Sequence, residues 1–357
     1  MEFIGVPGVF GTPHEIGLTH GHAASKPIAR SIAFYTWMFS TTAKLSWPEV
    51  RNLASDFEPV IRKKWPEYLE EMSGIAEGAG VALEDIIAIN VRTKITFGLY
   101  DERGSDGCTA LSWKTGGEGA IGSWLAQNWD WNPRQQENLI QLTIEQEGKP
   151  TIKMMTEAGL IGKIGINSEG VGVCLNAIKA RGMDPTRLPC HLGLRMVLES
   201  RSRDEAVAKL EKFGIASACH MLVADGESGG IGLEWSSVEV RKVVQNSKGQ
   251  VFHSNHWLEK HEGVGQDTNW LEDSGYRVKR IEELCGLIKD QEVGRDVLFE
   301  KVFKDVGNWP GAICRSAEGK SMSATLFNII MDLKEKKAYV SVGRPVEPLG
   351  AFTLSFD

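Results

Sequence analysis

A short stretch of this chain, Asp106-Gly107-Cys108-Thr109, contains the residues best suited to covalent chemistry. Cys108 follows a charged, glycine-containing loop over residues 101–107 and precedes the alternating segment Thr109-Ala110-Leu111-Ser112-Trp113. A cysteine at the start of a strand, behind a flexible loop, suits a nucleophile that becomes a new N-terminus by self-cleavage. In such enzymes the freed α-amino group acts as the base for its own side chain. Cys108 is therefore our candidate nucleophile.

The other cysteines give no comparable signal. The chain has six cysteines, and none belongs to a Cys-x-x-Cys pair. Scattered thiols in a long chain without a secretory signal are expected to be reduced rather than paired in disulfides. Most such cysteines are small buried hydrophobic side chains, and we expect this of Cys174, Cys190, Cys219, Cys285 and Cys314.

Composition limits the classes of function. With 357 residues, 42% of them hydrophobic and 24% charged, the chain is typical of a soluble globular protein with a large core. Its net charge of −7 disfavours nucleic acid as the main partner. No apolar run approaches the roughly 18 residues of a membrane helix, and we find neither a secretory signal nor a peroxisomal C-terminal tripeptide. We therefore expect a cytoplasmic protein without a membrane partner.

Two histidine pairs are the only hints of a metal. His20 and His22 would point about 200° apart on a helix, so they do not share a site easily. His253 and His256 have no carboxylate cluster beside them in the sequence. We interpret both pairs as structural and expect neither a metal nor a cofactor.

Residues up to about 100 are expected to be mostly helical. Thr12-Pro13-His14-Glu15 and Ser46-Trp47-Pro48-Glu49 have the pattern of capping boxes, which begin helices. Apolar residues at helical spacing extend these helices, with breaks near Pro27 and Pro66. The predicted helices cover residues 13–39, 47–64, 68–79 and 83–97.

After Cys108 the hydrophobic period changes to two, which predicts strands separated by tight turns. The predicted strands cover residues 109–113, 120–128, 138–146, 151–156, 161–166, 170–177, 218–224, 230–235, 239–244, 251–254, 325–332, 338–343 and 352–356. Helices are predicted at residues 189–213, 275–289 and 294–303. This order predicts one α+β domain over residues 1–357, in which two antiparallel sheets pack together with helices outside.

Six short blocks occur along the chain in the order and at the separations of a known family. They are Gly11-Thr12-Pro13-His14-Glu15-Ile16-Gly17, Asp106-Gly107-Cys108-Thr109, Gln127-Asn128-Trp129-Asp130, Thr156-Glu157-Ala158-Gly159, His253-Ser254-Asn255-His256 and Ala324-Thr325-Leu326-Phe327-Asn328-Ile329-Ile330. In these blocks the chain resembles the acyl-coenzyme A:6-aminopenicillanic acid acyltransferase (isopenicillin N acyltransferase) family. The resemblance extends from about residue 10 to about residue 345.

The resemblance implies an N-terminal nucleophile (Ntn) hydrolase fold with a four-layer αββα core. It also implies a precursor that cleaves itself between Gly107 and Cys108, leaving an α segment (1–107) and a β segment (108–357) associated. Cys108 would take an acyl group from acyl-CoA or an amide as a thioester and pass it to an amine or water. The implied partners are a small-molecule amide, an amine or acyl-CoA as co-substrate, and the cleaved α segment.

General chemistry supports this mechanism. Attack of Cys108 on the carbonyl of Gly107 would give a thioester, and its hydrolysis would free the Cys108 amine. Glycine at position 107 allows backbone conformations closed to other residues, so strain there would favour the shift. A free α-amino group has a pKa of about 7.7–8.0, so it can accept the thiol proton near neutral pH without a histidine.

The resemblance also implies roles for residues outside the cleavage site. Asn255 matches an asparagine that helps to hold the oxyanion, although asparagine at a strand end is most often a turn residue. Asp130 matches an aspartate that orients the amine and thiol of the cysteine, the alternative being an exposed carboxylate at a strand end. Thr109 either assists self-cleavage or is simply a β-branched strand residue.

The chain departs from the family at Gly319-Lys320-Ser321-Met322-Ser323. Met322 stands where penicillin-making members have an active-site arginine, and a thioether cannot replace a guanidinium. Either the choice of substrate changes, or Arg315 partly compensates; Ser321 is a further candidate site residue. We expect a paralogue that acts on another amide or acyl acceptor.

Three hypotheses stay open from the sequence. The first is a self-processing cysteine acyltransferase or amidohydrolase. The second is an uncleaved, catalytically weak or inactive relative that binds a small molecule. The third is a conventional Cys–His hydrolase that uses His253 or His256 and needs no chain cleavage.

Overall fold

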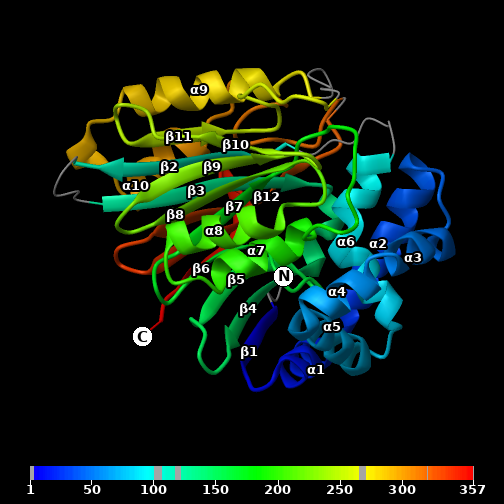
Figure 1. The fold of residues 1–357 in the computed structure, drawn as a ribbon. Coiled ribbons are helices and arrows are strands. Elements are labelled where there is room, and N and C mark those ends of the chain that lie inside the picture. Colours follow the sequence, from blue (N-terminus) through cyan, green and yellow to red (C-terminus); the bar gives the residue numbers. More distant parts are fainter. Residues whose placement is uncertain (1–3, 100–106, 117–121, 265–270, 320, 357) are drawn as a thin grey trace.

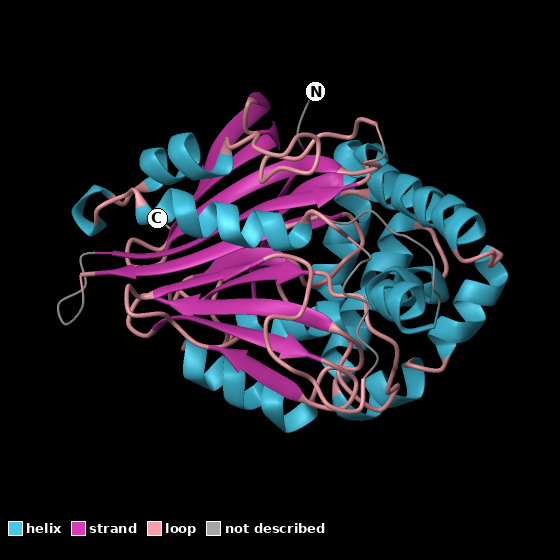
Figure 2. Cartoon of the chain, turned by 90° about the horizontal axis from the view of Figure 1, so that it is seen from above, coloured by secondary structure: helices cyan, strands magenta, loops and turns pink. Residues whose placement is uncertain are grey.

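Two β-sheets lie face to face and form the centre of the molecule (Figures 1 and 2). The computed structural model describes residues 4–99, 107–116, 122–264, 271–319 and 321–356. One sheet has eight strands in the order β1-β4-β5-β6-β7-β8-β9-β10, and the other has six in the order β11-β2-β3-β12-β13-β14. Helices contact the outer faces of both sheets, so the layers are helix, sheet, sheet, helix. The predicted α+β class and αββα layering are confirmed.

Most of the strands are buried, whereas the edge strands β10 (Val240–Val243) and β14 (Glu347–Leu354) are partly or mostly exposed. The eight-stranded sheet contains β1 (Ile4–Phe10), β4 (Leu139–Glu145), β5 (Ile152–Glu157), β6 (Ile164–Asn167), β7 (Gly172–Asn176), β8 (Cys219–Asp225), β9 (Gly229–Trp235) and β10 (Val240–Val243). The six-stranded sheet contains β2 (Thr109–Thr115), β3 (Gly122–Trp131), β11 (Gln250–His253), β12 (Ala324–Asp332), β13 (Lys337–Arg344) and β14 (Glu347–Leu354).

The helices form three groups. The first group lies beside the sheets (Figure 1) and contains α1 (Pro13–Ala23), α2 (Ser25–Thr42), α3 (Trp47–Ser55), α4 (Glu58–Lys64), α5 (Pro66–Ala79) and α6 (Leu83–Leu99). The second, α7 (Cys190–Leu198) and α8 (Arg203–Phe213), contacts the eight-stranded sheet. The third, α9 (Ser274–Gly286), α10 (Arg295–Leu298) and the π-helical turn η3 (Phe299–Phe303), covers the six-stranded sheet. Short 3-10 turns η1 (Pro133–Asn138) and η2 (Asp290–Glu292) complete the described elements.

The first strand corrects the sequence prediction. β1 pairs with β4 in parallel, so the eight-stranded sheet is not wholly antiparallel and the first hundred residues are not all helical. Pro7 and two glycines hide this strand in the sequence, because proline and glycine weaken a strand pattern. An edge position tolerates the missing N–H of proline, and β1 is the edge of its sheet.

The predicted helix over residues 189–213 is also wrong in one respect, because it is two helices. α7 ends at Leu198, and α8 begins after Ser202, whose hydroxyl accepts the backbone N–H of Glu205 at 3.2 Å. Ser202 with Glu205 has the spacing of a capping box, so the signal for a new helix was present in the sequence.

Buried ion pairs join the first hundred residues to the rest of the chain. Glu157, at the end of β5, accepts from Arg92 of α6 at 2.5 Å, from Lys163 at 3.0 Å and from the hydroxyl of Tyr35. Burial opposes the ionisation of this carboxyl, but Arg92 and Lys163 together hold its pKa at about 2. Glu157 is therefore a buried carboxylate that contacts residues before and after position 107 in the sequence.

A second anchor lies between α5 and α7. The guanidinium of Arg195 holds Glu71 through both carboxylate oxygens, at 2.9 and 2.8 Å, and all of these groups are buried. Two-point pairing of this kind is among the stronger charge interactions in proteins.

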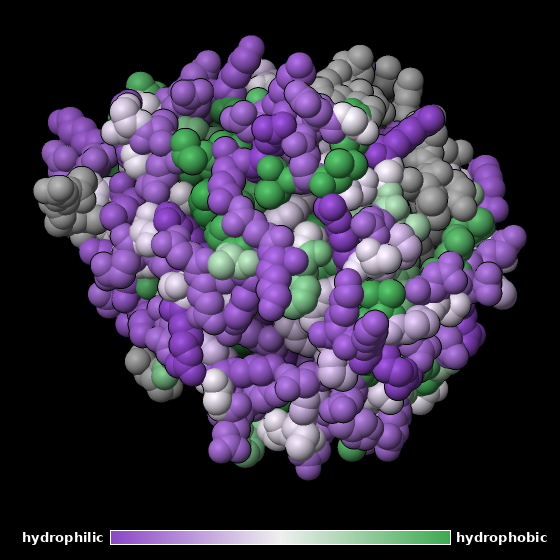
Figure 3. Space-filling model, viewed as in Figure 1, coloured by the Kyte–Doolittle hydropathy of each residue, from purple (hydrophilic) through white to green (hydrophobic). Residues whose placement is uncertain are grey.

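The face of the molecule in Figure 3 is mainly hydrophilic, with apolar residues in small patches.

Glycines bring α1 and α5 into close contact. A Cβ added to Gly17 would lie 2.0 Å from the carbonyl oxygen of Glu71, and one added to Gly74 would lie 2.1 Å from that of His14. Gly21 and Gly78 repeat the contact one turn later, at 2.4 and 2.3 Å from backbone oxygens. Two helix backbones can approach this closely only where no side chain separates them.

We expect Gly74→Ala to lower the free energy of unfolding by about 1–3 kcal/mol or more, because the added methyl group meets a backbone atom that has little room to move. Gly286→Ala is the matched control, since a Cβ there meets nothing within 4 Å, and it should change stability by less than about 1 kcal/mol. Urea denaturation of both variants measures the difference. Equal stabilities would show that α1 and α5 separate at little cost.

Candidate functional site

Cys108 lies directly before β2 with its backbone held from two sides. Its side chain is 1% exposed, and its Sγ lies 3.8 Å from the backbone oxygen of Asp130 on the neighbouring strand. Its carbonyl oxygen accepts from Arg277 Nη1 at 2.7 Å and from Asn176 Nδ2 at 3.1 Å. The predicted nucleophile therefore occupies one fixed position at the end of the six-stranded sheet.

Gly107 packs directly on a guanidinium. A Cβ at this residue would lie 2.3 Å from Nε and 2.7 Å from Cζ of Arg315. Lack of space is the physical reason for glycine here, because any side chain would displace Arg315.

Asp130 is buried in a hydrogen-bonding network rather than exposed at a strand end. Its Oδ1 accepts from the hydroxyl of Thr325 at 2.7 Å, and its Oδ2 lies 3.5 Å from Nε of Arg315. Arg315 also pairs with Asp273 and donates from Nη1 to the hydroxyl of Ser321 at 3.0 Å. The structure thus brings together the sequence-predicted residues Asp130, Arg315 and Ser321.

Asn255 is fully buried after β11, which does not fit an ordinary surface turn. Its Oδ1 accepts from Arg277 Nη2 at 2.9 Å, and its Nδ2 donates to the carbonyl of Ala177 at 3.0 Å. Its backbone N–H donates to the hydroxyl of Ser274 at 2.7 Å. An amide nitrogen carries two N–H donors, so the bond to Ala177 commits one of them.

Arg277 is the main residue that the sequence analysis missed. It joins Cys108, Asn255 and Thr109, whose hydroxyl accepts from Nη1 at 3.0 Å, and its Nε lies 3.0 Å from Asp273. A signal was available, because Arg277 lies on the buried stripe of α9, at the i and i+4 spacing that also buries Ile281 and Cys285. A charged residue on such a stripe indicates a buried ionic contact.

In the described part of the chain, four charged groups near Cys108 balance one another. Arg277 and Arg315 both pair with Asp273, and Arg315 also faces Asp130. Burial lowers the pKa of Arg277, while the carboxylate of Asp273 acts in the opposite direction. Two positive and two negative groups thus lie beside the candidate cleavage bond.

The histidines near the site are committed elsewhere. Both ring nitrogens of His253 have partners, Glu234 Oε1 at 2.8 Å and the backbone oxygen of Ser254 at 2.8 Å. Burial, with the neighbouring His253, lowers the pKa of His256 to about 4, and its Nδ1 lies 2.7 Å from the hydroxyl of Ser274. These contacts do not favour a Cys–His hydrolase.

Met322 does not replace a guanidinium in the site. Its side chain is 53% exposed, whereas Arg315 is buried against Gly107 and Asp130. Methionine at position 322 therefore leaves the two buried arginines, Arg277 and Arg315, in place.

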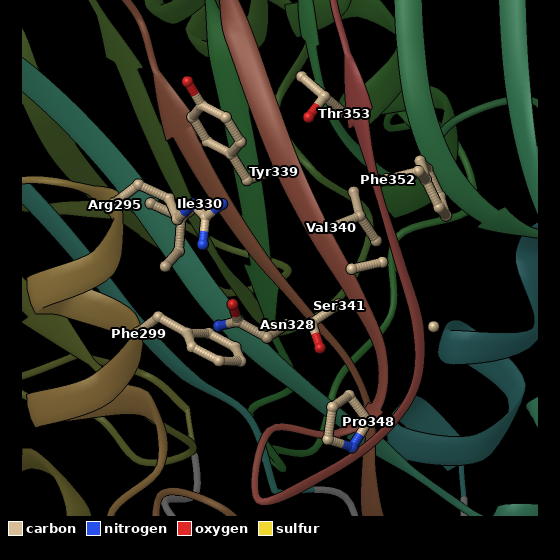
Figure 4. Close-up of a pocket in the computed structure, with 12 residues that line it drawn as sticks. Arg295, Phe299, Asn328, Ile330, Tyr339, Val340, Ser341, Pro348, Phe352 and Thr353 are labelled. Carbon is tan, nitrogen blue, oxygen red and sulfur yellow. The ribbon is translucent and has the colours of Figure 1, made fainter.

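A described cavity on the six-stranded sheet lies elsewhere. It has a volume of about 440 Å³ and is lined by Arg295, Phe299 and residues of β12, β13 and β14, including Ile330, Tyr339 and Phe352 (Figure 4). Cys108, in contrast, belongs to the apolar core between the sheets. This cavity is therefore not the space around the candidate nucleophile.

Two other features bear on possible ligands. Within residues 4–356, apart from the segments that the structure does not describe, no three His, Cys, Asp or Glu side chains are arranged to hold a metal ion. The described helices include none that is both long and apolar enough to span a membrane.

Comparison with known proteins identifies the family. The model of a family described as acyl-coenzyme A:6-aminopenicillanic acid acyl-transferase matches residues 115–347. The acyl-coenzyme A:6-aminopenicillanic-acid-acyltransferase 40 kDa form of Emericella nidulans is 42% identical over 348 residues, which are 97% of this chain and 95% of the relative.

Two solved structures are similar at low identity. Penicillin V acylase from Agrobacterium tumefaciens has a TM-score of 0.43 at 14% identity, over 70% of this chain and 86% of that chain. A variant of conjugated bile acid hydrolase from Clostridium perfringens has a TM-score of 0.48 at 16% identity, over 70% and 92%. By its family match and its relative in Emericella nidulans, the chain belongs to the acyl-coenzyme A:6-aminopenicillanic acid acyltransferase family and is an acyl-transferring enzyme.

Proposed function

We propose that this enzyme is a self-processing Ntn hydrolase that works through a thioester on Cys108. The acyl group comes from acyl-CoA or an amide and passes to an amine, which is transfer, or to water, which is hydrolysis. The observation that carries the proposal is the fixed position of the Gly107–Cys108 junction, with Arg315 against Gly107 and two donors on the Cys108 carbonyl.

Self-cleavage and turnover use the same chemistry. The Cys108 thiol attacks the carbonyl carbon of Gly107, the C–N bond breaks, and Gly107 becomes a thioester on the sulfur. The thiol proton passes to the departing nitrogen, which becomes the free α-amine of Cys108. Water then cleaves the thioester and gives the carboxylate of Gly107 and the free thiol of Cys108. During turnover this amine takes the thiol proton and later delivers it to the leaving group.

The surrounding residues have distinct roles in this proposal. Asn255 donates an amide N–H to the oxyanion, an interaction worth about 3–4 kcal/mol in comparable sites. Asp130 and Arg315 orient the amine and thiol of Cys108, and Ser321 holds Arg315 through its hydrogen bond of 3.0 Å. Thr109 shares Arg277 with the Cys108 carbonyl, which ties the first strand residue to the site.

The two products of cleavage, residues 1–107 and 108–357, stay associated as one domain. Glu157 with Arg92, and Arg195 with Glu71, are buried pairs that cross the cleavage point. β1 adds backbone pairing with β4. Separation of the two products would leave charges in each of them buried without a partner, which is strongly unfavourable.

The substrates are small amides, amines or acyl-CoA thioesters. The relative in Emericella nidulans is named for acyl-coenzyme A and 6-aminopenicillanic acid. Because Met322 replaces a family arginine, we propose a different amide or acyl acceptor for this paralogue. The buried Arg315 and Arg277 argue against an inactive binding protein, because the charged site is complete without an arginine at 322. The cytoplasm remains our proposed compartment.

Cys108→Ala should abolish self-cleavage, because the attacking sulfur is removed. Intact mass spectrometry is expected to show two fragments, broken between Gly107 and Cys108, for the wild type and a single chain for the variant. Cys174→Ala is the control: its thiol is buried, and burial raises its pKa well above the usual value, so that variant should cleave normally. A single uncut wild-type chain would contradict the proposal and favour the uncleaved relative.

Gly107→Ala should slow self-cleavage at least about tenfold, because the new methyl group displaces the guanidinium of Arg315 at a cost of about 1–3 kcal/mol. The fraction cleaved is followed over time by gel electrophoresis. Gly350→Ala is a matched control, since a Cβ there meets nothing within 4 Å. Cleavage of Gly107→Ala at the wild-type rate would mean that the contact with Arg315 does not constrain the reaction.

A further inference from the structure

Arg277 connects several parts of the site. Its side chain is 0% exposed, although it carries a full charge on a helix outside the sheet. Its three nitrogens contact Asp273, the Cys108 carbonyl, the Thr109 hydroxyl and the Asn255 amide. Burial of a charged side chain costs free energy unless its donors are all well placed, so this contact set is a specific feature of the fold.

The first contact fixes the nucleophile. Arg277 Nη1 donates to the Cys108 carbonyl at 2.7 Å, which is the length of a charge-assisted hydrogen bond. Asn176 donates to the same oxygen at 3.1 Å. After the proposed cleavage, Cys108 would be joined to the chain only through its carbonyl group. The two donors on that carbonyl would therefore determine where the amine and thiol of Cys108 lie.

The second contact fixes the direction of the Asn255 amide. Arg277 has only donors, so the atom that faces Nη2 at 2.9 Å must be the oxygen Oδ1. The nitrogen Nδ2 then faces the opposite way, toward Ala177. A reversed amide would place two donors against each other, so Arg277 selects the orientation in which Oδ1 of Asn255 faces the guanidinium and Nδ2 lies on the side of Ala177.

The third effect is electrostatic. Among the residues that the structure describes, the charged groups of this cluster are Arg277 of α9, Asp273 before it, Asp130 of β3 and Arg315 before β12. From β11 and the loop after it, His253 pairs with Glu234, and His256 is neutral near pH 7 because its pKa is lowered to about 4. Removing the charge of Arg277 would leave two carboxylates facing one guanidinium beside the amine.

We propose that Arg277 is a positioning residue of the acyl-transfer reaction: it holds Cys108 and Asn255 in register, and its charge keeps the freed Cys108 amine neutral and able to accept a proton. This inference rests on the proposed self-cleavage at Cys108. It assigns no atom of Arg277 to the substrate, because the guanidinium acts through the two residues that it holds.

Two substitutions separate charge from geometry. Arg277→Met removes both, and Arg277→Lys keeps the charge but cannot reach three acceptors at once. The first readout is the rate of alkylation of Cys108 by iodoacetamide against pH, measured on cleaved protein by peptide mass, because it needs no substrate. The second is the release of free coenzyme A from hexanoyl-coenzyme A, given as kcat and KM.

The sign of the pH effect follows from the charge. Loss of a nearby positive charge favours protonation of the amine and thiol, so their shared titration moves to higher pH. For Arg277→Met we expect the rise in alkylation rate to move up by about one pH unit. For Arg277→Lys we expect the rise to stay at the wild-type pH while kcat falls about tenfold or more.

Arg280→Met is the control on the same helix, because Arg280 pairs with Asp305 and lies outside the site; it should leave both profiles unchanged. A second possible outcome is an Arg277 variant that stays uncleaved but has the melting temperature of Cys108→Ala. That result supports the proposal, since a folded protein would then lack only the alignment. A cleaved Arg277→Met protein with the wild-type pH profile would overturn it. An uncleaved wild type would instead refute the proposed function, so the two failures are distinguishable.

Discussion

The structure depends on keeping two buried guanidinium groups beside the Gly107–Cys108 bond. Arg315 packs against Gly107, and Arg277 holds the carbonyl of Cys108. Buried charges are tolerated only when partners surround them, and Asp273 and Asp130 provide those partners. The C-terminal end of β3, the segment before β12 and the start of α9 must therefore lie close together. They carry Asp130, Arg315, and Asp273 with Arg277, respectively.

The same cluster constrains the bond between Gly107 and Cys108, at which we propose self-cleavage, from both sides. The constraint at Gly107 is steric: the chain passes so close to Arg315 that a Cβ would have to displace the guanidinium. The guanidinium and the donors on Cys108 fix both sides of the bond. Rigid placement of reacting groups is itself a large part of catalysis, because it removes the entropic cost of bringing them together.

Much of the fold could be predicted from the sequence, and the failures have physical causes. Capping boxes at Thr12 and Ser46 begin α1 and α3, and the period-two segments after Cys108 are strands. β1 was missed because its proline and glycines suit an edge strand but weaken the pattern. Arg277 was missed because its partners are distant in sequence and come together only when α9 packs on the sheet.

Residues that are distant in sequence also explain how a cut chain can remain one enzyme. Residues before Gly107 supply Arg92 and Glu71, and residues after Cys108 supply Glu157 and Arg195. These pairs form when the whole chain folds, before any bond is broken. The proposed cleavage would then remove one covalent link from a domain whose segments are already held together by buried charges and by the sheet. Folding as one chain would thus place the new N-terminus inside a site that is already assembled.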